Sequence, residues 1–216
     1  MSAAAPVAAQ TPTTVNPAGN VTPTTTPAKG VAAVAQSAPV DGRVAVLVQN
    51  ATTKPVRIDR ITAVATSTDG SVVIGARTTK AYPEVVAPTQ LALASVRFRA
   101  KDLAANPNPT IVVKVRSTRV SNARARRVLS VGGLVLSPPQ TGAVAQTMAA
   151  MLTNPTKAWT ARRPEVAVMC FGEASTPTTF TSARVPARRL APGKTASVSV
   201  PLTTLCPAYL VAARAS

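Results

Sequence analysis

The side chains that most often carry catalysis are scarce in this chain. It contains no histidine, which removes the usual serine and cysteine triads and the commonest ligand of transition metals. The seven acidic residues are scattered, and no D-x-D or E-x-x-E spacing brings two carboxylates together. Gly132-Gly133 is not part of a phosphate-loop sequence. We therefore expect no catalytic residue, no metal site and no cofactor, and we expect the protein not to be an enzyme.

The two cysteines can carry structural chemistry. Cys170 lies in an apolar segment, residues 166–171, and Cys206 lies just before the last predicted strand. Strands this far apart in sequence can be neighbours across a β-sandwich, so we expect a disulfide that closes a loop of about 35 residues. Two buried free thiols are the alternative. A disulfide requires an oxidising compartment or a virion-like setting.

The third chemical feature is positive charge. The chain has 24 Lys and Arg against 7 Asp and Glu, a formal net charge of +17. Residues 43–120 hold 12 basic and 4 acidic groups, and residues 121–216 hold 11 basic and 2 acidic groups, so the excess lies outside the first 42 residues. Such a surface favours an anionic partner, although solubility through self-repulsion is an alternative. The densest basic positions are the candidate polyanion contacts: Arg57, Arg60, Arg124, Arg126, Arg127, Arg162, Arg163, Arg188 and Arg189.

Aromatic residues are too few to form a stacking surface for bases. They make up 3% of the chain, and sequence-tolerant binding of single strands depends on such stacking. Most of them fall in or beside predicted strands, and Trp159 follows a predicted turn, where we expect it to anchor a core. Sequence-specific reading of nucleic acid is therefore not expected.

The elements that must position these groups are short strands. The apolar residues are mainly Ala and Val, and 20 prolines and 10 glycines are spread along the chain, which disfavours long helices and favours strands joined by turns. Residues 145–152 are the one place where a short helix competes with a strand. No run of about 18 apolar residues occurs, so no membrane span is expected.

A strand-and-turn plan occurs twice. A turn that begins at Asn50 is followed 36 residues later by a second turn at Val86, and a turn at Asn154 is followed 36 residues later by one at Leu190. An alternating strand follows the second turn in each half, at residues 91–98 and 195–202. Equal spacing of two turn types indicates a repeated unit, and strands at this spacing are typical of a β-sandwich.

These patterns predict an all-β fold with two tandem immunoglobulin-like β-sandwich modules. Residues 1–42, rich in Ala, Thr and Pro without periodicity, are expected to be an extended, low-complexity, disordered arm or tether. Module 1 is expected over 43–120 and module 2 over 140–216, with residues 121–139 as a basic connector that runs into the first strand of module 2.

The pattern of an N-x-T-x-K-P turn, a strand and then APG before an alternating strand resembles the FxLYD family of immunoglobulin-like modules of bacterial extracytoplasmic proteins. The residues that carry this resemblance are 50–56 with 86–98, 154–157 with 190–202, and the ending at 206–211. The F-x-L-Y-D string itself does not occur. The resemblance implies a non-catalytic binding or spacer domain, often anchored at the cell surface.

Two hypotheses for function follow. The first is a non-catalytic extracytoplasmic or cell-surface protein that binds or scaffolds through two basic modules on a flexible tether. Its partner would be a protein or an anionic polymer such as a cell-wall polymer. The alternative is a self-assembling capsid, decoration or other shell subunit whose arm orders on assembly, which could contact nucleic acid non-specifically. No export signal is visible at residues 1–6, so the first hypothesis expects a secreted protein whose signal has been removed, and the alternative expects a virion.

Overall fold

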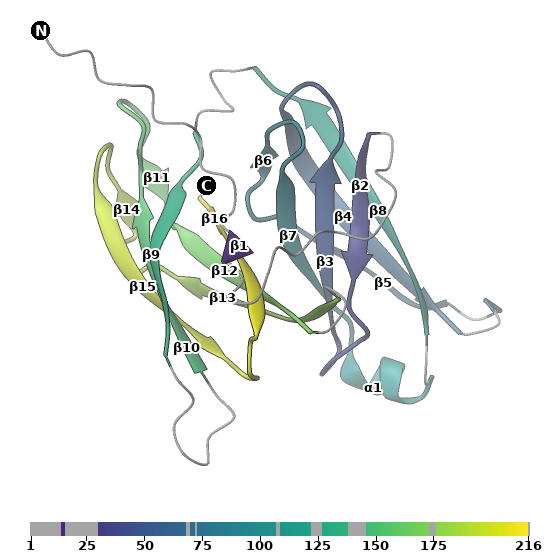
Figure 1. The fold of residues 1–216 in the computed structure, drawn as a ribbon. Coiled ribbons are helices and arrows are strands. Elements are labelled where there is room, and N and C mark those ends of the chain that lie inside the picture. Colours follow the sequence, from purple (N-terminus) through teal and green to yellow (C-terminus); the bar gives the residue numbers. More distant parts are fainter. Residues whose placement is uncertain are drawn as a thin grey trace, which may run out of the picture.

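The computed structural model describes residues 14–15, 30–67, 70–71, 73–106, 109–121, 127–137, 146–172 and 176–215. Within these residues antiparallel strands dominate, and the only helix is the five-residue α1 (Ala100–Ala104). The strands form two β-sandwiches that lie side by side (Figure 1). The prediction of an all-β fold with two sandwich modules is confirmed. No helix in the described part is long and apolar enough to cross a membrane.

Module 1 consists of two sheets that enclose a core of Val, Ile and Ala side chains. One sheet has the order β2-β3-β7; in the other, β4 pairs with β5 and β6 along one edge and with β8 along the other. Connections that switch between sheets in this way are typical of immunoglobulin-like sandwiches. The strands are β2 (Val31–Gln36), β3 (Arg43–Asn50), β4 (Val56–Thr66), β5 (Val73–Thr79), β6 (Val85–Val86), β7 (Leu91–Arg97) and β8 (Thr110–Arg119).

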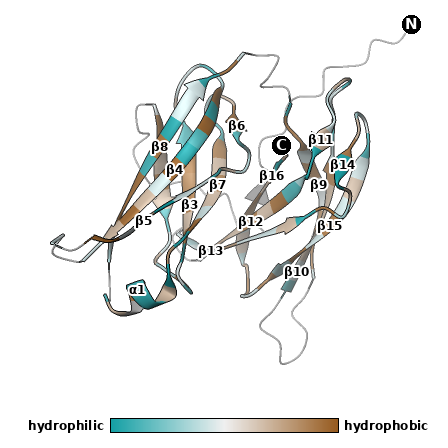
Figure 2. Ribbon diagram, turned by 180° about the vertical axis from the view of Figure 1, so that it is seen from behind, coloured by the Kyte–Doolittle hydropathy of each residue, from teal (hydrophilic) through white to brown (hydrophobic). Residues whose placement is uncertain are grey.

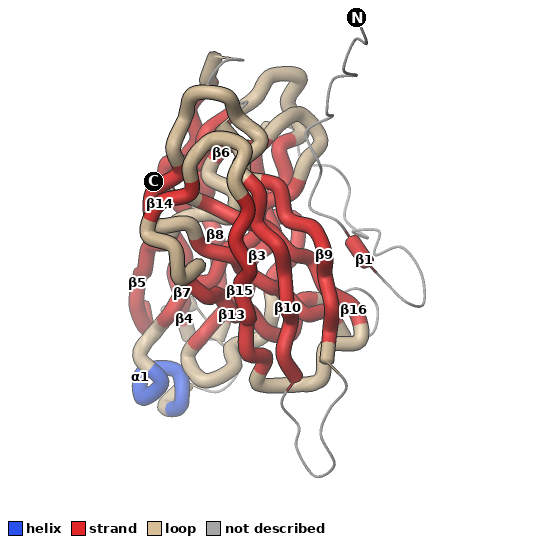
Figure 3. The backbone as a smooth tube through the Cα atoms, turned by 90° about the vertical axis from the view of Figure 1, so that its left-hand side faces the viewer, coloured by secondary structure: helices blue, strands red, loops and turns tan. Residues whose placement is uncertain are grey.

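Module 2 has the same strand order. Its sheet β9-β10-β15 corresponds to β2-β3-β7 and is seen in Figure 3, and β13-β12-β16 corresponds to β5-β4-β8. The short pair β11-β14 takes the place that β6 and the start of β4 occupy in module 1. The strands are β9 (Ser130–Leu136), β10 (Gln146–Thr153), β11 (Ala161–Arg162), β12 (Glu165–Phe171), β13 (Pro177–Arg184), β14 (Arg189–Leu190), β15 (Thr195–Leu202) and β16 (Ala208–Arg214). Residues 146–153 are thus a strand and not the competing helix.

The predicted boundary of the arm is wrong at its C-terminal end. Residues 31–36 are not disordered but form β2, which pairs with β3. Val31 and Ala33 pack against the core of module 1, whereas Val34 is buried on the opposite face of the strand. A strand buried on both faces shows no polar-apolar alternation, and its small Ala residues resemble those of the arm. Of the rest of the arm, the structure describes β1 (Thr14–Val15), which pairs with β16, and Gly30; the remainder lies outside the described residues.

A buried asparagine fixes the same turn in both modules. The Asn50 side-chain amide donates to the carbonyls of Lys54 and Val86, and the Asn154 amide donates to the carbonyls of Trp159 and Leu190, at 2.7 to 3.0 Å. Each Oδ1 accepts from the hydroxyl and the backbone N–H two residues later. Both asparagines are fully buried, so each joins two turns 36 residues apart without leaving a polar group unpaired.

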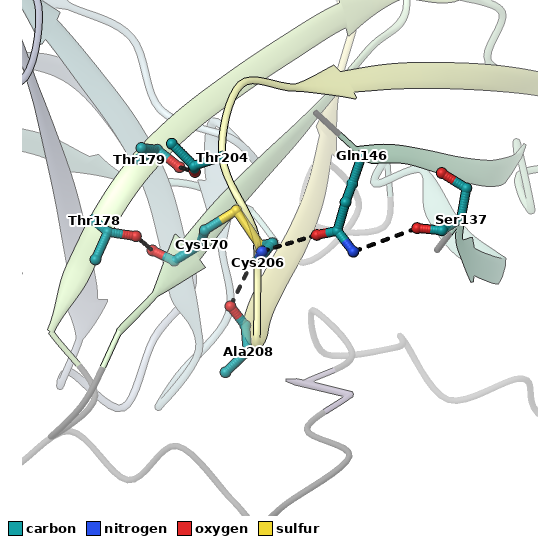
Figure 4. Close-up of a disulfide and its surroundings, with 8 residues drawn as sticks. All are labelled: Ser137, Gln146, Cys170, Thr178, Thr179, Thr204, Cys206 and Ala208. Atoms are coloured by element: carbon teal, nitrogen blue, oxygen red, sulfur yellow. Dashed lines mark hydrogen bonds between the residues drawn. A yellow bond between two sulfur atoms is a disulfide. The ribbon is translucent and has the colours of Figure 1, made fainter. Parts of the chain in front are cut away.

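The expected disulfide is present in module 2. Cys170 of β12 is bonded to Cys206, with 5.2 Å between their Cα atoms (Figure 4). The segment at Cys206 is also held by a hydrogen bond from its backbone N–H to Oε1 of Gln146 on β10, at 2.9 Å. The disulfide therefore links the segment just before β16 to β12, the strand that lies between β13 and β16 in their sheet.

Replacing Asn154 with alanine should destabilise the protein. Asn154→Ala removes the donors to two carbonyls and the acceptor for Thr156, so the free energy of unfolding should fall by about 2–4 kcal/mol, as measured by urea denaturation. Lys157→Ala, at an exposed position of the same turn, is the control and should change it by less than about 0.5 kcal/mol. Equal losses for the two variants would contradict the role assigned to the asparagine.

Removing the disulfide should destabilise module 2. The Cys170→Ala/Cys206→Ala variant should lose roughly 3–4 kcal/mol of unfolding free energy, because the cross-link closes a loop of about 36 residues in the unfolded chain. In denaturant without reductant, neither cysteine of the unmodified protein should react with iodoacetamide, and the mass should be that of the chain less two hydrogens. Alkylation of both would show that the bond does not form.

Candidate anion-binding cleft

A break in one strand of module 2 lies beside a concavity lined by five arginines. Where module 1 has the continuous β4, module 2 has β11 and β12, separated by Arg163 and Pro164. Arg163 has a φ of 45°, a left-handed conformation that costs a non-glycine residue about 1–2 kcal/mol. Proline has no N–H for the ladder. The two residues therefore turn β11 away from β12, and β11 pairs with β14.

The arginine cleft lies beside this break. It encloses about 860 Å³, and its lining consists solely of arginine, proline and valine. Arg162 and Arg189 are directly opposite each other in the β11-β14 ladder, an arrangement in which like charges repel. All five arginines are exposed. The lining residues are Arg162, Arg163, Pro164, Arg184, Val185, Pro186, Arg188 and Arg189.

The backbone holds the cleft arginines in place. The Arg163 N–H donates to the Arg188 carbonyl at 2.8 Å, and the Val185 N–H donates to the Pro164 carbonyl at 3.0 Å. Among the described residues, no carboxylate lies within ion-pairing distance of Arg163, Arg188 or Arg189. A guanidinium fork matches the oxygens of a phosphate or carboxylate, so the cleft can bind an oxyanion with several forks at once.

A partly buried carboxylate between the two modules anchors one cleft arginine. Glu165 accepts a hydrogen bond from the Tyr82 hydroxyl of module 1 at 2.7 Å and pairs with Arg214 at 2.6 Å and with Arg184 at 3.2 Å. The Arg214 guanidinium carbon also lies 4.2 Å from the centre of the Tyr82 ring, and this ring lies 5.7 Å from that of Phe180. The cluster thus joins the modules through both charge and aromatic contact.

This cluster shifts the pKa of two of its members. Burial alone would raise the pKa of the Glu165 carboxyl, but the hydrogen bonds from Tyr82 and Arg214 outweigh it and lower the pKa below the ordinary 4.5. Burial, followed by the hydrogen bond to Glu165, raises the pKa of Tyr82 to about 12. Glu165 is therefore ionised at neutral pH and acts as a fixed acceptor.

A second basic concavity lies between the modules. This inter-module crevice encloses about 230 Å³ and is lined by Arg57, Arg127 and Arg214, with Glu84 as the one carboxylate of its lining. Trp159 also lines it and packs against the core of module 2, as expected of a core anchor, while its indole is only partly buried.

The structure brings together six of the nine predicted arginine contacts in two places. Arg162, Arg163, Arg188 and Arg189 share the cleft, and Arg57 and Arg127 share the crevice. Arg60 lies in neither lining; it faces Arg116 across the β4-β8 ladder. Arg124 and Arg126 lie outside the described residues.

Two basic residues of the site were missed by the sequence analysis. Arg184 and Arg214 both lie opposite Glu165 in the ladders of β12 with β13 and β16. A register for these strands would have found them, but the isolated residues carry no local signal. Arg57 of module 1 occupies the position that Arg162 occupies in module 2. Arg60 occupies the position of Glu165 and not that of Arg163, so the two modules do not carry the same pair of arginines here.

Comparisons with known proteins assign no family. No family model matches the chain, and no curated protein matches it. Among solved structures, the chain is similar to a transglutaminase from red sea bream, with a TM-score of 0.29 and 16% sequence identity. The similarity covers 88% of this chain and 30% of the transglutaminase, so the chain spans less than a third of that protein. At this identity and TM-score no activity is carried over.

The Glu165 cluster predicts a specific loss of stability in acid. Because the folded-state pKa of Glu165 is below its unfolded value, its stabilising contribution is present above about pH 4.5 and is lost as the pH falls through the folded pKa. Glu165→Gln should lower the free energy of unfolding at pH 7 and flatten its decline below pH 4.5, as measured by urea denaturation at each pH. Glu84→Gln is the control, because its partner Lys80 is largely exposed. An unchanged acid slope in Glu165→Gln would contradict the assignment.

Proposed function

We propose that the protein is a non-catalytic binding module that holds an anionic polymer in the arginine cleft. The observation that carries this proposal is the lining of the cleft, where five arginines converge and two face each other across one ladder. A bound oxyanion can accept hydrogen bonds from guanidinium groups of this kind. The strained backbone at Arg163 supports the same interpretation, because such strain clusters at functional sites.

The chemistry of the lining favours binding over catalysis. Arginine stays protonated in proteins, and proline and valine side chains have no acid, base or nucleophile. Glu165, which pairs with the cleft residue Arg184, is also bonded to Arg214 and Tyr82. The side chains of the cleft lining therefore offer a polyanion hydrogen-bond donors and apolar surface.

We also propose a compartment and a family relationship for the protein. The disulfide fits an extracytoplasmic protein, and we propose a relationship of both modules to the FxLYD family on their buried asparagine turns.

Binding should depend on the cleft arginines more than on total charge. Arg188→Ser/Arg189→Ser should weaken the binding of long-chain inorganic polyphosphate about tenfold to thirtyfold, since each lost contact is worth about 1 kcal/mol. The plot of log affinity against log salt should become shallower by about two. Calorimetric titration at several salt concentrations measures both.

The matched control removes the same charge from another pair. Arg43 and Arg97 also face each other across a ladder and are exposed, at the α1 end of module 1. Arg43→Ser/Arg97→Ser should change the affinity by no more than about twofold. If both double variants lose affinity equally, the cleft is not the binding site and the effect is one of net charge.

A further inference from the structure

One carboxylate, that of Glu165, pairs with an arginine of the arginine cleft and with an arginine of the inter-module crevice. Arg184 lines the cleft and pairs with Oε1 of Glu165, and Arg214 lines the crevice and pairs with Oε2. Glu165 thus bridges one arginine of the cleft and one arginine of the crevice. Strands β11 and β14, which carry cleft residues, and β6, which carries a crevice residue, lie toward the same end of the molecule as the C-terminus (Figure 1).

The two concavities also have the same chemical character. In each, arginines are mixed with apolar side chains: Pro164, Val185 and Pro186 in the cleft, and Pro83, Leu129 and Trp159 among the lining of the crevice, which also holds Glu84. Arginines mixed with apolar surface suit a chain in which anionic groups alternate with short organic units. A ligand with contiguous charge would leave the apolar positions without a partner.

We propose that the cleft and the crevice form one track across both modules and that its ligand is a linear polyol phosphate. This inference rests on the proposed function and specifies its ligand. The phosphodiester groups of the ligand contact the arginines, and its polyol units lie over the prolines, Val185 and Trp159. The ligand passes over Glu165, whose charge is already neutralised by Arg184 and Arg214.

A phosphodiester polymer fits the track better than nucleic acid. Both carry one charge per repeat, but bases require aromatic surfaces on which to stack, and Trp159 is the one tryptophan of the chain and the one aromatic residue in either lining. Small polyol units need only shallow apolar contact, which the prolines provide.

Trp159 makes the track directly testable in the intact protein. As the sole tryptophan, it reports occupation of the crevice through its fluorescence. Long poly(glycerol phosphate) should bind at least tenfold more tightly than glycerophosphoglycerol, which has a single phosphodiester, and only the polymer should change the Trp159 emission.

The double variants distinguish a failure of the proposed track from a failure of the proposed function. Arg57→Ser/Arg127→Ser should abolish the emission change and most of the advantage of the polymer, while glycerophosphoglycerol binding stays within about twofold of the unmodified protein. Arg188→Ser/Arg189→Ser should weaken both ligands, and Arg43→Ser/Arg97→Ser should weaken neither.

Three results would overturn one or both proposals. If the Arg57→Ser/Arg127→Ser variant binds the polymer as the unmodified protein does, with the same emission change, the track is wrong and the cleft alone stands. If oligothymidylate of matched length binds more tightly than poly(glycerol phosphate), the ligand class is wrong. If the Arg188→Ser/Arg189→Ser variant binds both glycerol phosphates unchanged, the proposed function fails as well.

Discussion

The structure depends on two sheets that are buried on both faces. Sheet β2-β3-β7 of module 1 packs its outer face against β16-β12-β13 of module 2, so the inner strands contact a module core on one side and the partner module on the other. Along β12, Val166 and Val168 point into the core of module 2, whereas Ala167, Met169 and Phe171 point to module 1. The four sheets thus stack as successive layers, and apolar colouring follows β3 and β7 in the middle of the molecule (Figure 2). Burial of this apolar surface fixes the modules relative to each other.

This packing uses non-equivalent faces of the two modules. The face of β12 that is covered by module 1 has its counterpart in module 1 on β4, where Thr62, Val64 and Thr66 stand in place of Ala167, Met169 and Phe171. The adjacent β8 presents Lys114 and Arg116 to solvent. An asymmetric contact between like modules could continue indefinitely, but here the next face is polar. The two modules thus share a strand order, but the face of module 1 that corresponds to the covered face of module 2 is more polar.

The inter-module contact also organises the basic end of the molecule. Tyr82 comes from module 1, while Glu165 and Arg214 come from module 2, so the hydrogen bond from Tyr82 to Glu165 and the contact of the Tyr82 ring with Arg214 exist only when the modules are packed together. On the other side of Glu165, the break at Pro164 and the left-handed Arg163 release β11 to pair with β14 and open the arginine cleft. The arginine cleft therefore lies where module 2 departs from the strand pattern of module 1. The low pKa of Glu165 keeps the charge between the two concavities constant at neutral pH.

The amino-acid sequence by itself determined the local features of this protein. Turn residues such as Asn50 and Asn154 and alternating strands such as β15 could be inferred because they depend on nearby residues or on a fixed period. The pairing of Cys170 with Cys206 could be inferred because the chain has only these two cysteines, both in module 2. The tertiary structure decided the rest. A continuous apolar run indicates that a strand is buried on both faces but not what covers the second face, so the module interface could not be predicted. The Ala-rich β2 resembles the preceding arm in composition, so its pairing with β3 could not be predicted either. Arg162 and Arg189 are likewise brought opposite each other by a ladder between distant segments, and no spacing along the chain encodes that register.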